Sequence, residues 1–324
     1  MLQIFPVTFP FFALVLCGYL VTRWRWLPLE SIPGLNTFVL YFALPCMLYR
    51  AGAGTPIGRL LDPGAAGMYL MCAALIVALA VASARRRGLN WNDASFGALV
   101  AAFPNSGFMG VPLVVDLLGP SAAGPAIMSM GFDMVVTTSA CVALSRLGTA
   151  GTDGMRRAVV AALKGMAVNP LPWSILLGGL ASATGLALPG PVERTVGMLA
   201  MAASPVALFT LGAVLARAQF TSASRDKAAD GPRGWGDVPR LVFLKLVLHP
   251  ALVLAAGTAA RAAGVPLDAQ VLTVLVLVAA LPSASNVTML AERYHADSGR
   301  VARIVLLSTA AAFLSFSAVV ALVR

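Results

Sequence analysis

Two short stretches of the sequence place proline beside small amide and hydroxyl residues inside otherwise apolar segments. The first reads AAFPNSGFMGVPL and the second AALPSASNVTML. Each proline lacks an N–H and clashes with the carbonyl four residues before it, so a helix is expected to break there. The half-helix that follows would present free N–H groups and its positive dipole end, which together bind anions. The candidate binding residues are Pro104, Asn105, Ser106 and Gly107 in the first stretch and Pro282, Ser283, Ser285 and Asn286 in the second.

The polar residues after each proline also suit the N-cap of a new half-helix, so side-chain capping is expected at both breaks. Proline kinks and small residues serve tight helix packing in membranes as well, and either stretch alone could be purely architectural. Because the two stretches occupy corresponding places in the chain, the pair favours a binding site over packing.

Two charged residues interrupt other apolar segments, Asp133 in GFDMVVT and Lys245 in FLKLVLHP. Ionisable groups inside a membrane are costly and are functional candidates by default, here as proton carriers. Two structural alternatives stay open: an Asp–Lys pair between helices, or a Lys245 side chain that reaches toward the nearby aqueous face. His249, which precedes Pro250, is interpreted as a packing histidine.

The composition requires a membrane around these elements. Hydrophobic residues make up 59% of the 324 positions, charged residues only 11%, and the mean hydropathy is +0.86. A soluble domain carries roughly a quarter charged residues. The net charge of +10 comes from residues between apolar runs, without the aromatic-interleaved stripe that nucleic-acid binding would need. The four cysteines all fall inside apolar runs, so neither a disulfide framework nor a metal site is expected.

The apolar segments predict an all-α membrane protein with ten transmembrane helices, of which the fourth and ninth are broken. The Lys and Arg residues alternate between loops, with 17 on one side and 5 on the other. Because positive loops stay in the cytoplasm, both termini are predicted to lie outside, in the periplasm, and the protein in the cell inner membrane. The longest polar stretch, residues 218–240, is interpreted as a flexible cytoplasmic linker.

A faint internal repeat divides the chain. A shift of 160 residues aligns Gly18 with Gly178 and Pro45 with Pro205. Since each unit holds five helices, an odd number, the second must be inverted in the membrane, which is a plan typical of secondary transporters. The predicted divisions are a first repeat over 1–145, a connecting cytoplasmic loop over 146–165, and a second, inverted repeat over 166–324.

Catalytic signatures do not support an intramembrane enzyme. Neither histidine stands in an HExxH motif, no GxSxG elbow or Walker A lysine occurs, and Asp133 alone cannot make an aspartyl dyad. The sequence therefore predicts a secondary active transporter for a small organic anion, with no cofactor and with Asp133 and Lys245 as coupling candidates. An anion channel is the alternative, because matched broken helices also line pores, and an intramembrane enzyme is a more distant one.

Six motifs, in order along nearly the whole chain, resemble those of the auxin efflux carrier family, whose bacterial members include malonate and malate carriers. They are GYLVTRWRWLP, NTFVLYFALPCMLY, FPNSGFMGVPL, NPLPWSILLGGL, SPVALFTLGAVLA and ALPSASNVTMLAERY. The resemblance implies a scaffold of helices one, two, six and seven, and a moving domain in which helices four and nine cross. It also implies carboxylate recognition near Asn105, Pro104 and Pro282.

The expected partners follow from this function. They are a small organic anion such as a mono- or dicarboxylate, a coupling H⁺ or Na⁺, and the lipid bilayer, with a homodimer left open and no nucleic acid. Asn286 stands four residues after its proline whereas Asn105 is adjacent to its own, so the ligands of the two halves are not expected to be symmetric.

Overall fold

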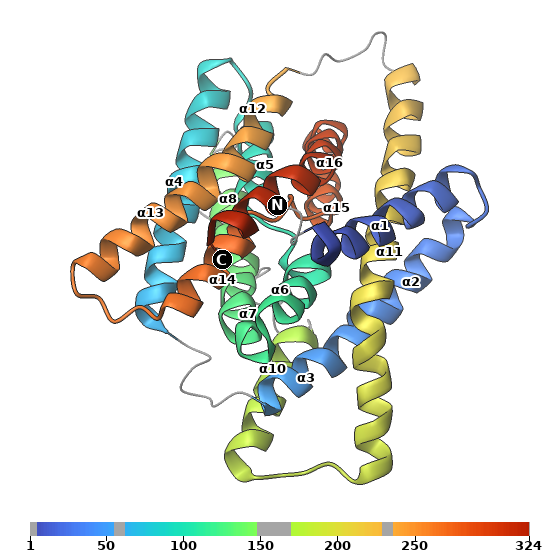
Figure 1. The fold of residues 1–324 in the computed structure, drawn as a ribbon. Coiled ribbons are helices and arrows are strands. Elements are labelled where there is room, and N and C mark those ends of the chain that lie inside the picture. Colours follow the sequence, from blue (N-terminus) through green and yellow to red (C-terminus); the bar gives the residue numbers. More distant parts are fainter. Residues whose placement is uncertain (1–4, 55–61, 148–169, 229–235, 324) are drawn as a thin grey trace.

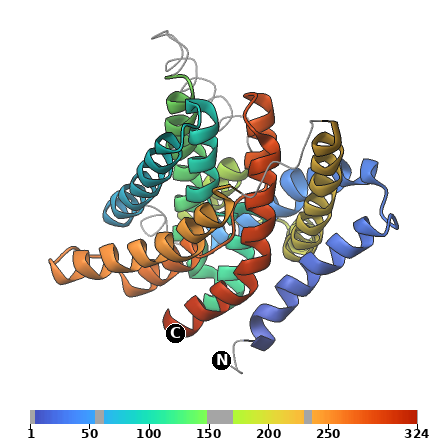
Figure 2. The ribbon, with the colours of Figure 1, turned by 90° about the horizontal axis from the view of Figure 1, so that it is seen from above.

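The computed structural model describes residues 5–54, 62–147, 170–228 and 236–323, and every regular element in these ranges is a helix. Figure 1 shows the fold as a set of crossing helices, with α1 and α11 on one side and α4 and α13 on the other. The view from above separates the same two groups (Figure 2). The described residues contain no strand, only one isolated bridge between two chain segments. The expectation of an all-α membrane protein is therefore confirmed at this level.

The first half of the chain begins with α1 and ends with α8, and several of its spans combine α-helix with short 3₁₀ or π segments. The elements are α1 Phe5–Arg23, η1 Leu29–Ser31, α2 Ile32–Phe38, η2 Val39–Ala43, α3 Leu44–Ala53, α4 Pro63–Arg86, α5 Trp91–Ala102, η4 Ser106–Gly110, α6 Val111–Leu118, η5 Pro120–Ala122, α7 Ala123–Phe132, η6 Asp133–Thr137 and α8 Thr138–Ser145.

The second half begins at Pro170, the first residue of a helix, where the fixed φ of proline is favourable. Its elements are α10 Pro170–Thr184, α11 Gly190–Ala228, α12 Val238–Phe243, η7 Leu244–Leu248, α13 His249–Ala262, α14 Ala269–Ala279, α15 Asn286–Arg293 and α16 Ser298–Val323.

Six of the described helices are long and apolar enough to cross a bilayer, and three shorter apolar helices accompany them. The long ones are Leu29–Ala53, Pro63–Arg86, Pro120–Ser145, Gly190–Arg217, Val238–Ala262 and Ser298–Val323. Large apolar side chains on them stay exposed, for example Met71, Met201 and Leu314. Surfaces of this kind need lipid around them, so the protein is a multi-pass membrane protein.

The helix α11 corrects one prediction from the sequence. Its helical conformation continues past Arg217 to Ala228, so the interpretation of the whole stretch 218–240 as a flexible linker is wrong for the first eleven positions. At 39 residues α11 is about 58 Å long, well beyond the roughly 30 Å of the hydrocarbon core. Polar composition therefore marked the end of the membrane span rather than the end of the helix.

Both predicted helix breaks are confirmed. The helix α5 ends at Ala102 and helical structure resumes at Ser106, so Pro104 lies in the gap between them. The helix α14 ends at Ala279 and α15 begins at Asn286, with Pro282 in between. Proline cannot donate to the hydrogen-bond ladder and so favours a break at both positions, although α1 and α11 continue through Pro10 and Pro205.

Two helix pairs approach so closely that only glycine fits between them. A Cβ on Gly18 of α1 would collide with the backbone carbonyl of Phe209 on α11. In the same way, a Cβ on Gly178 of α10 would collide with the carbonyl of Tyr49 on α3. Close backbone approach through small residues is how helices associate where lipid competes for apolar surface. These contacts pair α1 with α11 and α10 with α3, and α11 also packs against α3, so the four helices form one packed group.

Replacing Gly178 by alanine is expected to destabilise the protein by about 1–3 kcal/mol, because the obstacle is a neighbouring backbone that cannot rotate away. A matched control is Gly67→Ala in α4, where an added Cβ would meet nothing within 4 Å. That change should be neutral or stabilise the helix by about 0.5–1 kcal/mol. Thermal unfolding in detergent measures both, and equal effects of the two variants would contradict the close contact.

At one end of the molecule a buried ion pair joins three helices. Arg300 of α16 donates from Nε and Nη2 to the two carboxylate oxygens of Asp237, just before α12, at 2.8 and 2.6 Å. It also donates from Nη1 to the carbonyl of Asp93 in α5 at 2.8 Å. Gly97 provides the room, because a Cβ there would lie 2.6 Å from Nη2 of Arg300. Bidentate geometry of this kind fixes α5, α12 and α16 relative to one another.

Candidate functional site

The two helix breaks meet each other. The backbone of Pro104 forms an isolated antiparallel bridge with that of Ser283. Two hydrogen bonds hold it: the N–H of Asn105 donates to the carbonyl of Pro282 at 2.8 Å, and the N–H of Ala284 donates to that of Phe103 at 3.0 Å. We call residues 103–106 and 282–285 the crossing. The two predicted motifs, 178 positions apart in the sequence, therefore form one structure.

Three buried polar side-chain atoms at the crossing have no hydrogen-bond partner among the described residues. They are Nδ2 of Asn105, Oγ of Ser106 and Oγ of Ser283. The residues are 2%, 1% and 0% exposed. Buried polar groups are nearly always paired, and an unpaired one costs about 1–3 kcal/mol. Three together leave hydrogen-bonding capacity at the crossing that the described residues do not satisfy.

The expectation that side chains cap the two half-helices is wrong. Neither Asn105 nor Ser285 makes a side-chain cap bond. At the first break the carbonyl of Asn105 instead accepts from the N–H groups of Met109 and Gly110, at 3.1 and 2.9 Å. At the second, Ser285 has helical φ and ψ of −68° and −26°, which is not the extended conformation of an N-cap.

The missing caps leave backbone donors free. The N–H groups of Gly107 and Phe108 after the first break, and of Ser285 and Asn286 after the second, have no acceptor among the described residues. The helical runs that follow are Ser106–Leu118 and Asn286–Arg293. Free N–H groups at a helix N-terminus favour a bound anion. The arrangement can therefore bind a carboxylate without any cationic side chain.

The predicted site residues do not contribute equally. Pro104, Asn105, Ser106, Pro282 and Ser283 are all buried at the crossing. Two more, Gly107 and Ser285, are partly exposed, and Asn286 is exposed at the start of α15. The two amides thus occupy different environments, in agreement with the asymmetry expected from their different spacing to proline.

Sequence reasoning missed Ser308, which supports the crossing from α16. Its hydroxyl accepts a hydrogen bond from the N–H of Ser283 at 3.1 Å and donates to the carbonyl of Val305 at 3.0 Å. Ser308 is fully buried. A serine within an apolar helix carries no signal of this role in the sequence, because its partner lies 25 positions earlier in the chain.

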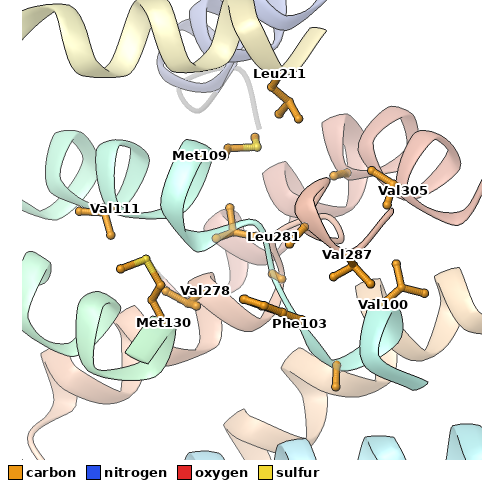
Figure 3. Close-up of a cluster of buried hydrophobic side chains, with 14 of the residues drawn as sticks. Val100, Phe103, Met109, Val111, Met130, Leu211, Val278, Leu281, Val287 and Val305 are labelled. Atoms are coloured by element: carbon orange, nitrogen blue, oxygen red, sulfur yellow. The ribbon is translucent and has the colours of Figure 1, made fainter. Parts of the chain in front are cut away.

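Apolar side chains surround the polar crossing. Figure 3 shows Phe103 and Leu281 among Met109, Val278 and Val287, and all five are buried. Asn105, Ser106 and Ser283 therefore lie buried among apolar side chains, while Ser285 stays partly exposed. Since hydrogen bonds are electrostatically stronger in such surroundings, the free donors of the two half-helices gain affinity for a charged ligand.

A second polar cluster lies beside α4, η6 and η7 and contains both predicted intramembrane charges. Asp133 accepts a hydrogen bond from the hydroxyl of Tyr69 at 2.6 Å and another from Thr137 at 3.0 Å. All three residues are buried. The partner Tyr69, 64 positions away on α4, was not identified from the sequence. We call Tyr69, Asp133, Thr137, Lys245 and His249 the ionisable cluster.

Lys245 belongs to this cluster and lies in η7. Its Nζ donates to the carbonyl of Ala279, the last residue of α14, at 2.8 Å and lies 3.3 Å from Nδ1 of His249. Lys245 is 0% exposed, so the alternative of a side chain reaching the aqueous face is wrong. His249 is buried as well, and its Nε2 has no partner among the described residues.

The described part of the structure shows no direct ion pair within 4 Å between Asp133 and Lys245, and the two sides of the cluster meet where the ring centres of Tyr69 and His249 lie 6.0 Å apart. Asp133 and Lys245 each belong to a π-helical turn, η6 and η7 respectively. Such turns are rare and often occur at functional sites. Because Lys245 contacts the end of α14, three residues before Pro282, the ionisable cluster adjoins the crossing.

Comparison with known proteins places the chain among transporters. The profile of a family described as "Membrane transport protein" matches residues 4–320, nearly the whole chain. The "Putative malonate transporter" of Rhizobium meliloti (strain 1021) is 29% identical over 330 residues, which covers 100% of this chain and 97% of that protein. These matches confirm the resemblance to the auxin efflux carrier family that the six motifs predicted.

Two further relatives are described as transporters without a substrate. An "Uncharacterized transporter" of Methanothermobacter thermautotrophicus is 30% identical, over 93% of this chain and 92% of its own length. The "Uncharacterized transporter YfdV" of Escherichia coli (strain K12) is 26% identical, over 63% of this chain and 60% of its own length.

Proposed function

The chain belongs to the membrane transport protein family, and on that premise we propose that it is a secondary active transporter for a small organic anion. Membership makes the chain a transporter and not an enzyme, as the missing catalytic motifs predicted. The proposed substrate is a mono- or dicarboxylate of the malonate or malate type, moved across the inner membrane. The name of the Rhizobium relative supports this class.

The observation that carries the proposal is the set of unpaired donors at the crossing. Backbone N–H groups after both breaks and the amide of Asn105 point to an acceptor that the described protein does not supply. A carboxylate offers several acceptor positions, and hydrogen bonds to a charged group contribute about 1.5–3 kcal/mol each. The opposed half-helices add the favourable ends of two dipoles.

We propose ten membrane spans. The six long helices are joined by α1 and α10, and by two broken spans in which α5 continues through the first break into Ser106–Leu118 and α14 through the second into α15. Discontinuous helices at a binding site are typical of secondary transporters, where the irregular backbone faces a cavity instead of lipid.

The glycine contacts support an inverted repeat of residues 1–145 and 166–324. Gly18 contacts Phe209, and Gly178 contacts Tyr49. Both pairs of equivalent positions, 18 with 178 and 49 with 209, lie 160 residues apart, the same shift that aligns the repeats. A two-fold axis that relates the two halves would convert the contact of Gly18 with Phe209 into the contact of Gly178 with Tyr49. Chance matches between the two sequences would not produce this equivalence of contacts.

The same contacts support a division into a fixed and a moving part. The packed group of α1, α3, α10 and α11 would form the scaffold. The remaining helices carry the crossing and the ionisable cluster, with α5, α12 and α16 held together by Arg300. A rigid unit that holds the substrate and slides along a scaffold is an elevator-type motion, and we propose this for transport.

The ionisable cluster is the proposed coupling site. Asp133 and Lys245 are both buried, and Lys245 donates to the carbonyl at the end of α14, next to the crossing. A change of charge at either residue would therefore alter the field around the substrate. The coupling ion would be H⁺ or Na⁺. The 17-to-5 division of Lys and Arg supports termini on the periplasmic side.

Transport into proteoliposomes tests the proposal. Radiolabelled malonate, malate and a monocarboxylate would be offered with and without an inward proton or sodium gradient. A secondary transporter is expected to accumulate one of these anions above its outside concentration when the coupling gradient is present. Equilibration without accumulation under every gradient would instead identify an anion channel, and no uptake of any carboxylate would refute the substrate class.

A further inference from the structure

An apolar groove of about 860 Å³ runs along the outside of the molecule between α4 and the η6–α8 helix. Its lining includes the alanines Ala74, Ala78 and Ala82 of α4 and Ala140 of α8, all of them exposed. On α4 these alanines recur every four positions, so they form one stripe along the helix. Larger apolar side chains also line the groove, such as Met71, which is 60% exposed.

One end of the groove is basic. Arg85 lines it and donates from Nη1 to the carbonyl of Leu89 at 2.6 Å. Its guanidinium also lies 4.8 Å from the centre of the Trp91 ring, another lining residue. These contacts hold the guanidinium of Arg85 in place. Its other N–H groups have no acceptor among the described residues. Two exposed arginines, Arg86 and Arg87, follow directly.

We propose that this groove binds an anionic phospholipid, with an acyl chain along the alanine stripe of α4 and the phosphate at Arg85. The groove combines a long apolar surface with a cation at one end, which is the complement of a lipid with a charged head. Along α4 its lining extends from Leu70 to Arg85, about 22 Å. One leaflet of the hydrocarbon core is roughly 15 Å deep. An acyl chain of that length, starting at Arg85, would therefore cover more than half of the groove along α4.

A free anion does not fit this surface, because apart from Arg85 and Trp91 at its end the groove offers a single polar side chain, Thr137. The position of Thr137 links the lipid to the ionisable cluster. Its hydroxyl donates to Asp133 at 3.0 Å, while the residue also lines the groove. A bound acyl chain would therefore exclude water from the groove side of Asp133. The site goes beyond the proposed transport activity, and its binding test does not depend on it.

The test compares lipid binding by the full chain and three variants in neutral detergent. The probes are phosphatidylglycerol and phosphatidylcholine with identical acyl chains, the chain-free head group glycerophosphoglycerol, and inorganic phosphate. Native mass spectrometry counts retained lipid, and thermal unfolding reports stabilisation. Arg85→Gln removes the proposed phosphate contact, and Ala78→Phe adds a large ring to the alanine stripe at a position whose side chain is exposed. Arg87→Gln is the control, since it removes the same charge outside the groove lining.

The wild-type chain and Arg87→Gln are expected to retain phosphatidylglycerol over phosphatidylcholine, and Arg85→Gln and Ala78→Phe to retain it at least about ten-fold less, equivalent to 1.4 kcal/mol. Equal retention of the two lipids by the wild type would overturn the proposal. So would unchanged retention in Arg85→Gln, or stabilisation by inorganic phosphate or the free head group as large as that by the lipid. Should Ala78→Phe fail to fold, the comparison of Arg85→Gln with Arg87→Gln decides alone.

Discussion

Replacement of Asn105 by aspartate is expected to abolish transport and to weaken carboxylate binding by a hundred-fold or more. The change removes the amide donor and sets a negative charge against the anion in surroundings that screen charge poorly. Asn105→Ala removes the donor alone. Loss of one hydrogen bond to a charged group is worth about 1.5–3 kcal/mol, or roughly ten- to hundred-fold in apparent affinity.

Thermal stability distinguishes a binding role of Asn105 from a structural one. The Nδ2 atom of Asn105 has no partner among the described residues, so its removal deletes an unpaired buried polar group. Asn105→Ala should therefore unfold at the same temperature as the wild type or slightly above it. Asn286→Ala is the matched control, an amide at the other half-helix whose side chain is exposed. Its effect on affinity should be much smaller.

Titration of the proposed dicarboxylate into detergent-purified protein measures the affinities. If both Asn105 variants bound it as tightly as the wild type, the anion would bind elsewhere and the crossing would be architectural. The proposed function would then need a different binding site, whereas the lipid groove would be unaffected.

The sequence predicted those features of the fold that depend on local chemistry. Pro104 and Pro282, each followed by small polar residues, located both breaks, whereas Pro10 and Pro205 lie within the unbroken helices α1 and α11. The pairing of the breaks is different, because the hydrogen bond from Asn105 to Pro282 depends on where distant helices pack. The family resemblance implied that helices four and nine cross, but it did not predict which residues would pair there.

The capping error has a specific physical origin. Asparagine and serine favour N-caps when their backbone is extended and their side chain is free to turn back. At the first break the N–H of Asn105 is already used by Pro282, and its carbonyl accepts two donors of the following turn. Tertiary pairing thus set the backbone of Asn105 at φ −77° and ψ 57°, which overrode the local preference and left its amide free.

The partners of the intramembrane charges were also beyond prediction from sequence. Asp133 was a clear candidate because charge is costly in an apolar helix, yet nothing near it in the sequence indicated Tyr69. Lys245 likewise contacts a backbone carbonyl, and any residue could supply that group. Sequence composition therefore identified the two charges, while the packing of α4, α13 and α14 determined what surrounds them.

Replacement of Asp133 by asparagine is expected to abolish gradient-driven accumulation while leaving substrate binding within a few-fold of the wild type. Asparagine has nearly the same shape and can still accept a hydrogen bond from Tyr69 or Thr137, but it cannot change its charge. Loss of one charge-assisted hydrogen bond would cost about 1.5–3 kcal/mol of stability, so the variant should still fold. Uptake would then be the same with and without the coupling gradient.

A matched variant distinguishes coupling from support of the fold. Tyr69→Phe removes the 2.6 Å hydrogen bond to Asp133 but keeps the carboxyl group. It should be destabilised by a similar amount and still accumulate substrate in response to the gradient. Uptake into proteoliposomes over a range of pH, with thermal unfolding of the same preparations, measures both properties. Two outcomes would assign Asp133 a structural role: a wild-type pH profile of uptake in Asp133→Asn, or an equal loss of accumulation in both variants. In either case, transport would depend on the contacts of the Asp133 side chain and not on its ability to change charge.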